Sequence, residues 1–119
     1  MKQVKHYDTG IMGELSAEEY LCKQGMTVAA RRFRREDGEI DLVMIDHDTI
    51  VFVEVKARPS DKQGTGLLAV NAAKKRRIFH AALAFLVEMQ YTERPVRLDV
   101  IEIIRDGILH IPNAFDVSQ

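Results

Sequence analysis

The stretch from Gly38 to Arg58, GEIDLVMIDHDTIVFVEVKAR, constrains the fold more than any other part of the chain. It contains two apolar runs rich in β-branched residues, separated by the polar residues DHD. Runs of this kind on either side of a polar turn are typical of two strands joined in a β-hairpin. We therefore expect this hairpin to form the centre of the protein.

The rest of the chain supplies further helices and strands around this hairpin. A helix is expected from about Thr9 to Lys23, ending at Gly25, and a longer helix from Leu68 to about Gln90. The longer helix carries an apolar stripe at helical spacing. A basic strand is expected to precede the hairpin, a loop with Pro and Gly to follow it, and two further strands to follow the second helix. The stripe consists of Ile78, Ala82, Phe85 and Met89. The basic strand is expected at residues 26–35 and the loop at residues 59–66. The last two strands are expected at residues 95–105 and 106–111.

This order of elements, α-β-β-β-α-β-β, predicts an α/β fold with a mixed central sheet and helices packed on it. The length of 119 residues is that of one domain, so residues 1–119 are expected to form a single unit with a hydrophobic core.

Charged side chains interrupt the two central strands, and their spacing is informative. Side chains alternate between the faces of a strand, so Glu54 and Lys56 lie on the same face. A two-residue loop would pair Asp46 with Thr49, and the same register would place Asp41 opposite Glu54. Residues directly opposite each other on a hairpin lie close together. The sequence therefore predicts that two carboxylates and one ammonium group converge.

Two ionised carboxylates in an apolar setting repel each other and require a cation. Lys56 supplies one positive charge, and a divalent metal would supply the rest. Because the candidate ligands are oxygen atoms, Mg²⁺ or Mn²⁺ is the expected ion. The alternative is a buried Asp–Lys–Glu ion group that only stabilises a particular pairing of the strands.

Three further charged residues have a functional interpretation and a structural one. Glu14 shares a helix face with Ala17 and is expected near the sheet, or it complements the helix dipole. Lys74 lies four residues before Ile78 and is expected along the sheet edge, or it extends to solvent. Asp99 lies within an apolar strand and is expected to point inward, where it could also form a structural ion pair.

The net charge is −1, but basic residues gather in two places, which can bind a polyanion locally or can simply be solvated faces. Cys22 is the only cysteine, which excludes an intrachain disulfide and a multi-cysteine zinc site. We expect a cytoplasmic protein because no apolar leader and no membrane-spanning run occur. The basic residues are Arg31, Arg32, Arg34 and Arg35 in the first cluster and Lys74, Lys75, Arg76 and Arg77 in the second.

Six stretches resemble, in order, the motifs of the bacterial YraN-like family: GELSAEEYL, GEIDLVMID, VFVEVKAR, AVNAAKKRRI, RLDVIEI and NAF. The resemblance extends from about Gly13 to Phe115, and the combination of motifs is specific. That family is similar to the restriction-endonuclease-like nucleases with a PD-(D/E)xK active site, and within them to the archaeal Holliday junction resolvases. The resemblance thus implies a restriction-endonuclease-like mixed central β-sheet flanked by helices.

The resemblance also implies roles for individual residues. By motif, Asp41 and Glu54 correspond to the Mg²⁺ ligands, and Lys56 to the lysine that positions or activates the attacking water. Glu14 corresponds to the helical glutamate of the resolvases. Ile40 stands where the motif has a proline, which is not a ligand.

The resulting hypothesis is a Mg²⁺-dependent endonuclease that hydrolyses phosphodiester bonds in nucleic acid, with structured or branched DNA as the expected substrate. The Val55 carbonyl is a further candidate metal ligand, and Glu14 is a candidate to bind a second ion or orient water. Phosphate contacts are expected from the two basic clusters. Paired cuts in a junction would require a homodimer.

Two other classes of function stay open. The first is a nucleic-acid-binding module that does not cut, which would need the basic clusters but no metal site. The second is a phosphatase or nucleotide hydrolase that uses the same metal. The chain has no GxxxxGK phosphate loop, which argues against a nucleoside triphosphatase.

Overall fold

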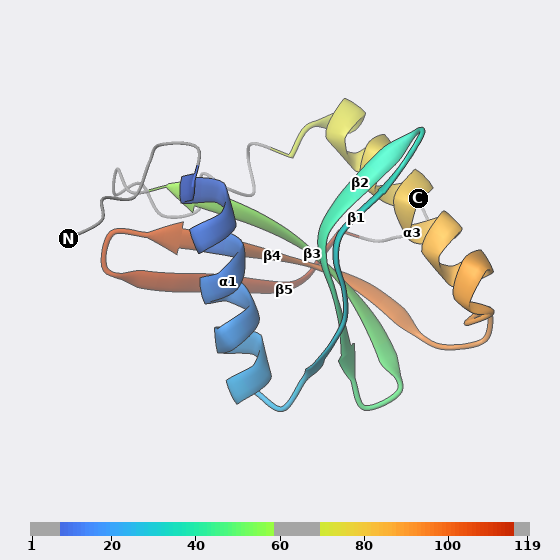
Figure 1. Cartoon of the computed structure of the whole chain (residues 1–119), viewed down its shortest axis with the longest axis horizontal. Coiled ribbons are helices and arrows are strands. Elements are labelled where there is room, and N and C mark those ends of the chain that lie inside the picture. Colours follow the sequence, from blue (N-terminus) through green and yellow to red (C-terminus); the bar gives the residue numbers. More distant parts are fainter. Residues whose placement is uncertain (1–7, 59–69, 116–119) are drawn as a thin grey trace.

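The computed structural model describes residues 8–58 and 70–115 of the chain. A five-stranded sheet runs in the order β1-β2-β3-β4-β5, with β3 and β4 parallel and the other neighbours antiparallel (Figure 1). The expected α/β fold, a mixed sheet flanked by helices, is confirmed. The elements are α1 (Asp8–Lys23), β1 (Thr27–Arg35), β2 (Gly38–Asp46), β3 (Thr49–Arg58), α3 (Ala72–Met89), β4 (Val96–Ile104) and β5 (Gly107–Phe115).

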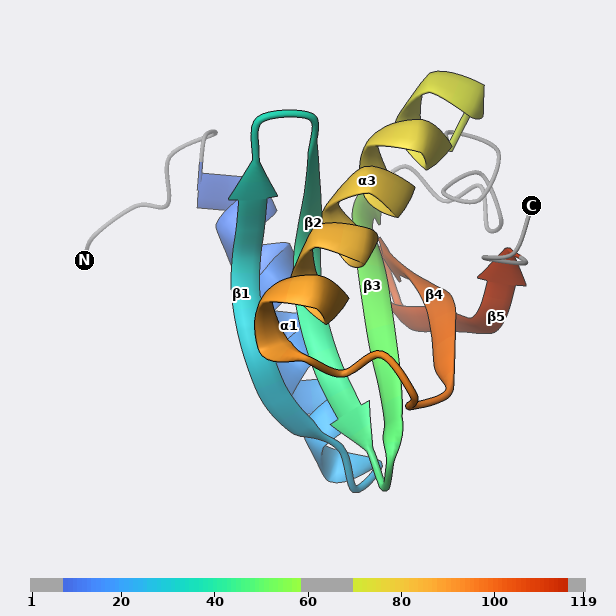
Figure 2. The same cartoon turned by 90° about the vertical axis from the view of Figure 1, so that its right-hand side faces the viewer.

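Helices α1 and α3 cover opposite faces of the sheet, with α3 in front and α1 behind in Figure 2. Parallel neighbours need a long crossover connection, and α3 lies within the connection from β3 to β4. Phe52 and Phe85 are buried in the core beneath α3, whereas Leu21 and Val53 are buried beneath α1. Because both faces are covered, β2 and β3 carry unbroken apolar runs, residues 42–45 and 50–53.

Several local expectations are confirmed. Asp46 pairs with Thr49 across the predicted two-residue loop. Gly25, at φ 101°, follows the end of α1, and glycine is the residue that adopts this backbone conformation most easily. The α3 helix begins at Ala72, with the Asn71 side chain accepting a hydrogen bond from the Lys74 amide at 2.9 Å.

The α3 helix and the last strand differ in detail from the expectation. Val70 and Asn71 precede the helix, and the expected start at Leu68 lies outside the described residues. Met89, expected on the apolar stripe, is 46% exposed, although the other three stripe residues are buried. The last strand extends to Phe115 and includes a proline, which is tolerated because β5 is an edge strand.

None of the helices in the described part of the chain has the length and apolar character needed to cross a membrane.

The end of the β1–β2 hairpin lies directly against the backbone of α3. A Cβ atom at Gly38 would lie 1.9 Å from the Arg77 carbonyl oxygen and 3.0 Å from the Ala81 nitrogen. No side chain fits at this distance, so a glycine is required where β2 begins. This close contact determines how far the start of β2 can move from the helix.

We predict that Gly38→Ala lowers the free energy of unfolding by about 1–3 kcal/mol or more, because the methyl group meets backbone rather than a flexible side chain. Gly13→Ala is the matched control. A Cβ there would meet its nearest neighbours at 3.7 Å, an ordinary contact, and alanine favours a helix by about 0.5–1 kcal/mol. Urea denaturation of both variants tests the contact. Equal midpoints for Gly38→Ala and the parent protein would show that β2 does not lie against α3.

Candidate functional site

The two central strands separate near their middle. The pairing of β2 with β3 runs from Asp46–Thr49 to Leu42–Val53, although β2 begins at Gly38 and β3 continues to Arg58. Beyond this point β2 rises with β1 beside α3, and β3 continues beside β4 (Figure 1). We call the place where the strands separate the fork. Asp41 and Glu54 are the first residues beyond the last pair, so both carboxylates lie at the fork.

A break in the alternation of side chains occurs at the same place. Ile40 packs in the core beneath α3 and Leu42 in the core beneath α1, although residues two apart on a regular strand share a face. The register of β1 with β2, Arg31–Leu42 and then Phe33–Ile40, places Arg32 opposite Asp41. Arg32 has φ 48°, in the left-handed region that non-glycine residues rarely adopt. The left-handed backbone at Arg32 and the break in alternation on β2 together take Asp41 out of the regular pleat.

Asp41 is tied to β3 through its side chain. Its Oδ2 atom accepts a hydrogen bond of 2.8 Å from the backbone N–H of Val55. This bond links β2 and β3 across the fork, just beyond the last strand pair. The expected pairing of Asp41 with Glu54 is absent from the strand register, and a side-chain hydrogen bond to the residue that follows Glu54 is present instead.

Glu54 is buried, with 2% of its surface exposed, and two lysines contact one of its oxygens. The Nζ atoms of Lys56 and Lys74 lie 3.2 and 3.3 Å from Glu54 Oε2. The other oxygen, Oε1, is buried and has no hydrogen-bond partner among the described residues. Lys74 was expected to contact phosphate, but in the structure it contacts Glu54. The site therefore holds one more ammonium group than the motif predicts.

The pKa of Glu54 is raised from 4.5 to about 7, first by burial and then by the negative charge of Asp41. Lys74 and Lys56 act in the opposite direction and lower it. Burial disfavours the charged form of a carboxyl group, and a nearby carboxylate adds to that effect. The two lysines thus compensate only part of the cost of an ionised Glu54.

Glu14 lies on the α1 side of the fork. Its Oε1 accepts a hydrogen bond of 2.7 Å from Arg32 Nε in an ion pair. The pKa of Glu14 is raised by burial and by the charge of Asp41, and the hydrogen bond from Arg32 acts against the rise. Asp41 therefore acts electrostatically on both Glu14 and Glu54.

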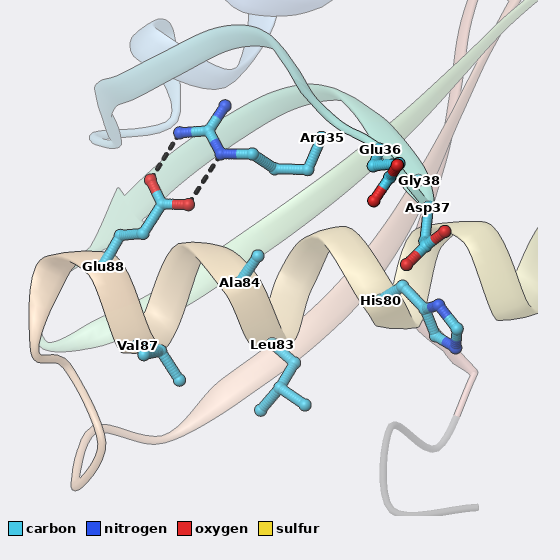
Figure 3. A pocket seen from close by; sticks show the side chains of 9 residues that line it. All are labelled: Arg35, Glu36, Asp37, Gly38, His80, Leu83, Ala84, Val87 and Glu88. Carbon is cyan, nitrogen blue, oxygen red and sulfur yellow. Dashed lines mark hydrogen bonds and ion pairs between the residues drawn. The ribbon is translucent and has the colours of Figure 1, made fainter.

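The basic cluster on β1 is mostly engaged with carboxylates of the same chain. Arg31 donates two hydrogen bonds to Glu18, of 2.7 and 2.9 Å. Arg35 pairs with Glu88 at one end of a hollow of about 610 Å³ between α3 and the β1–β2 turn, and no fork residue lines this hollow (Figure 3). Among the described residues, Arg34 forms no ion pair. Arg34 is thus the member of this cluster that is best placed to contact a ligand.

The basic cluster on α3 is also partly engaged. Arg77 lies 3.5 Å from Glu39, and the Lys75 ammonium lies 4.4 Å from the centre of the Phe115 ring. Arg76 is exposed and forms no ion pair within the part of the chain that the structure describes. The clusters seen in the sequence are therefore not two uniform cationic surfaces.

Asp99, expected to point inward, is completely buried and belongs to a separate ion group. Arg97 donates to both of its oxygens, His110 Nε2 lies 2.7 Å from Oδ2, and the Asn113 amide donates to Oδ1 at 2.9 Å. The pKa of Asp99 is lowered because these hydrogen bonds outweigh the effect of its burial. With both oxygens bonded, Asp99 has the structural role that was its alternative interpretation.

Sequence reasoning missed Glu102. This residue is completely buried and lies beside Lys56 in the register of β3 with β4. The signal was available in the stretch RLDVIEI, where an acid interrupts an apolar strand. Glu102 adds a third carboxylate to the strand positions around Lys56.

The fork fits a divalent ion in its donor chemistry. Asp41, Glu54 and the Val55 carbonyl provide oxygen atoms, and the buried Oε1 of Glu54 lacks a partner among the described residues. The described residues contain no group of three or more His, Cys, Asp or Glu side chains arranged to hold a metal. Two carboxylates with a backbone carbonyl suit Mg²⁺, which keeps several water ligands and uses few protein ones.

The residues of the fork lie in a region of the chain that is similar to known proteins. Residues 13–103, which include the whole fork, match the family described as "Uncharacterised protein family UPF0102". A UPF0102 protein of Saccharophagus degradans is 38% identical over 116 residues, covering 97% of this chain and 98% of the relative. A UPF0102 protein of Geobacter metallireducens is 43% identical over 113 residues, covering 92% and 93%. The names of these relatives state no activity.

The raised pKa of Glu54 predicts how stability depends on pH in metal-free buffer. Between about pH 4.5 and 7 the folded protein holds a proton on Glu54 that the unfolded chain releases, so stability falls as pH rises through this window. Glu54→Gln has no carboxyl group to titrate at this position, so it does not lose this stability as the pH rises. It should match the parent protein at pH 4.5 and exceed its free energy of unfolding at pH 8 by roughly 1–3 kcal/mol.

Urea denaturation in EDTA at both pH values measures this difference. Glu39→Gln, which removes a partly exposed carboxylate on the same hairpin, is the control and should leave the pH profile almost unchanged. A Glu54→Gln profile parallel to that of the parent protein would show that Glu54 is ionised without cost at neutral pH.

Proposed function

This chain belongs to the UPF0102 family, and we propose that it is a metal-dependent nuclease that hydrolyses phosphodiester bonds in nucleic acid. One observation carries the proposal: Glu54 is buried at the fork beside Asp41, between two lysines, with one oxygen lacking a partner among the described residues. A core that needs only stability does not require this arrangement, because apolar residues of similar size are often as stabilising as a buried ion pair.

Each fork residue has a role in this proposal. Asp41, Glu54 and the Val55 carbonyl would hold Mg²⁺ or Mn²⁺. The ion would polarise a phosphate oxygen and stabilise the negative charge that develops in the transition state. Lys56 shares a strand face with Glu54, so its ammonium group can stabilise the hydroxide formed from an attacking water.

Lys74 acts on Glu54 in this proposal, not on the substrate. Its ammonium group contacts the same Glu54 oxygen as Lys56, and it comes from α3, whereas Lys56 belongs to β3. A cation in this position favours the ionised form of Glu54, the form that binds a metal. Lys74 thus positions Glu54, which is a proposed metal ligand.

The proposed substrate is DNA, with the branched DNA of the resolvase resemblance as the first candidate. Arg34 and Arg76 are the exposed arginines of the two basic clusters that form no ion pair among the described residues. Both can contact backbone phosphates without breaking an internal contact. Paired cuts in a branched substrate would require a two-fold dimer.

A specific observation favours a second candidate, a binding module without cleavage. Lys56 and Lys74 already bring two positive charges to Glu54. An ion group neutralised in this way could persist without a metal, and the protein would then only bind nucleic acid.

Lys56→Ala separates the two candidates. We predict that cleavage falls by about a hundredfold to a thousandfold, because the lysine stabilises charge that develops during the reaction. Mn²⁺ binding should change little, because lysine is not a ligand and Lys74 still contacts Glu54 in this variant. The measurement is cleavage of linear, flapped and four-way-junction DNA in Mg²⁺ or Mn²⁺, with calorimetric titration of Mn²⁺ alongside.

Lys23→Ala is the matched control, since Lys23 is an exposed lysine of α1 that pairs with Glu19. It should cut as the parent protein does. Equal cleavage by Lys56→Ala and the parent would refute the role of Lys56. Binding of all three DNAs by the parent protein without any cleavage would establish the binding module instead.

A further inference from the structure

The ion pair between Arg32 and Glu14 joins β1 to α1 at the fork. Its Nε–Oε1 distance is 2.7 Å, and the side chains are 41% and 17% exposed. Arg32 lies opposite Asp41 in the strand register, and the charge of Asp41 acts on both members of the pair. Glu14 is therefore held by a cation within the field of the fork.

The backbone of Arg32 allows this contact. Arg31 and Arg32 are adjacent, yet both pair with carboxylates of α1, whereas neighbours on a regular strand point to opposite faces. The left-handed φ of 48° at Arg32 accompanies this departure. A non-glycine residue in this conformation stores strain and often marks a functional position.

The guanidinium group of Arg32 can bind a second anion. Only its Nε–H donates to Glu14, and a guanidinium has five N–H donors. The group borders a hollow of about 220 Å³ between α1 and β1, which gives an anion access from solvent. The residues that line this hollow are Glu14, Leu15, Glu18, Arg31, Arg32 and Leu42.

The pair is weak enough to be exchanged. An ion pair that solvent can reach contributes little to stability, and an arginine binds a phosphate through two parallel hydrogen bonds. A backbone phosphate can therefore replace a single carboxylate contact. Glu14 would then lose its hydrogen-bonded cation and keep only the non-bonded charge of Arg34 against that of Asp41, which is unfavourable unless another cation comes close.

We infer that Arg32 exchanges Glu14 for a phosphate of the nucleic-acid backbone, and that this exchange releases Glu14 toward the metal site at the fork. The inference rests on the proposed function and identifies Arg32 as the residue through which substrate binding acts on the fork. Arg32 is a positioning residue that acts through Glu14. Phosphate binding and metal binding then strengthen each other, because each favours the same position of Glu14.

A calorimetric titration of Mn²⁺ without nucleic acid tests the release of Glu14. Arg32→Gln should bind Mn²⁺ about threefold to fivefold more tightly than the parent protein, in line with the modest strength of an exposed ion pair. In a Glu14→Gln background the same substitution should give no gain. Arg32→Lys, which keeps the charge, should behave as the parent does. Arg31→Gln is the matched control, because Arg31 pairs with Glu18 instead, and it should also leave Mn²⁺ affinity unchanged.

A duplex DNA titration in EDTA tests the phosphate contact. Glu14→Gln should tighten binding about threefold to fivefold by freeing Arg32. In an Arg32→Gln background Glu14→Gln should have no effect.

The outcomes separate the inference from the proposed function. A parent protein that does not bind Mn²⁺ would overturn both. Normal Mn²⁺ binding with a gain from Arg32→Gln that persists without Glu14 would overturn only the inference, because the gain would then come from the lost charge alone. A duplex affinity that rises equally with and without Arg32 would also overturn it.

Discussion

The separation of β2 from β3 after Leu42 and Val53 is the constraint on which the proposed site depends. Had the pairing continued, Asp41 would occupy a regular position in a sheet whose two faces are both packed with apolar side chains. Because the strands separate, its carboxylate instead reaches the Val55 amide across the fork. Gly38 lies against the α3 backbone on one branch, and β4 pairs with β3 on the other, so the packing of both branches keeps the fork open.

Two buried carboxylates of the same sheet show why we regard the fork as functional and the Asp99 group as structural. Both oxygens of Asp99 accept hydrogen bonds, and its pKa is lowered. Glu54 is nearly as buried, yet one of its oxygens lacks a partner in the described part of the chain, and its pKa is raised. Burial is similar for the two groups, and their hydrogen bonding differs. A carboxylate that is costly to ionise in the metal-free protein is one whose free energy a bound cation would lower.

The sequence predicts the fold well because its apolar patterns are strong. The hairpin register followed from counting residues across the two-residue loop, and the end of α1 followed from Gly25. Sequence alone did not predict the break in alternation at Arg32, since only glycine signals a left-handed backbone in advance. It did not predict the contact of Lys74 with Glu54, because helical spacing indicates the face of a side chain but not which atom it contacts across a fork. For the same reason the internal ion pairs of the arginines were not foreseen.

If Asp41 and Glu54 together hold a divalent ion, as we propose, Mn²⁺ should raise the temperature at which the protein unfolds. A ligand that binds only the folded state at a hundred times its Kd stabilises it by about 2.7 kcal/mol, which raises Tm by several degrees. We expect this rise in the parent protein and in Asp46→Asn, a control at the other end of β2. Asp41→Asn and Glu54→Gln should show little or no rise. A full Mn²⁺-dependent rise in Asp41→Asn would show that Asp41 is not a metal ligand.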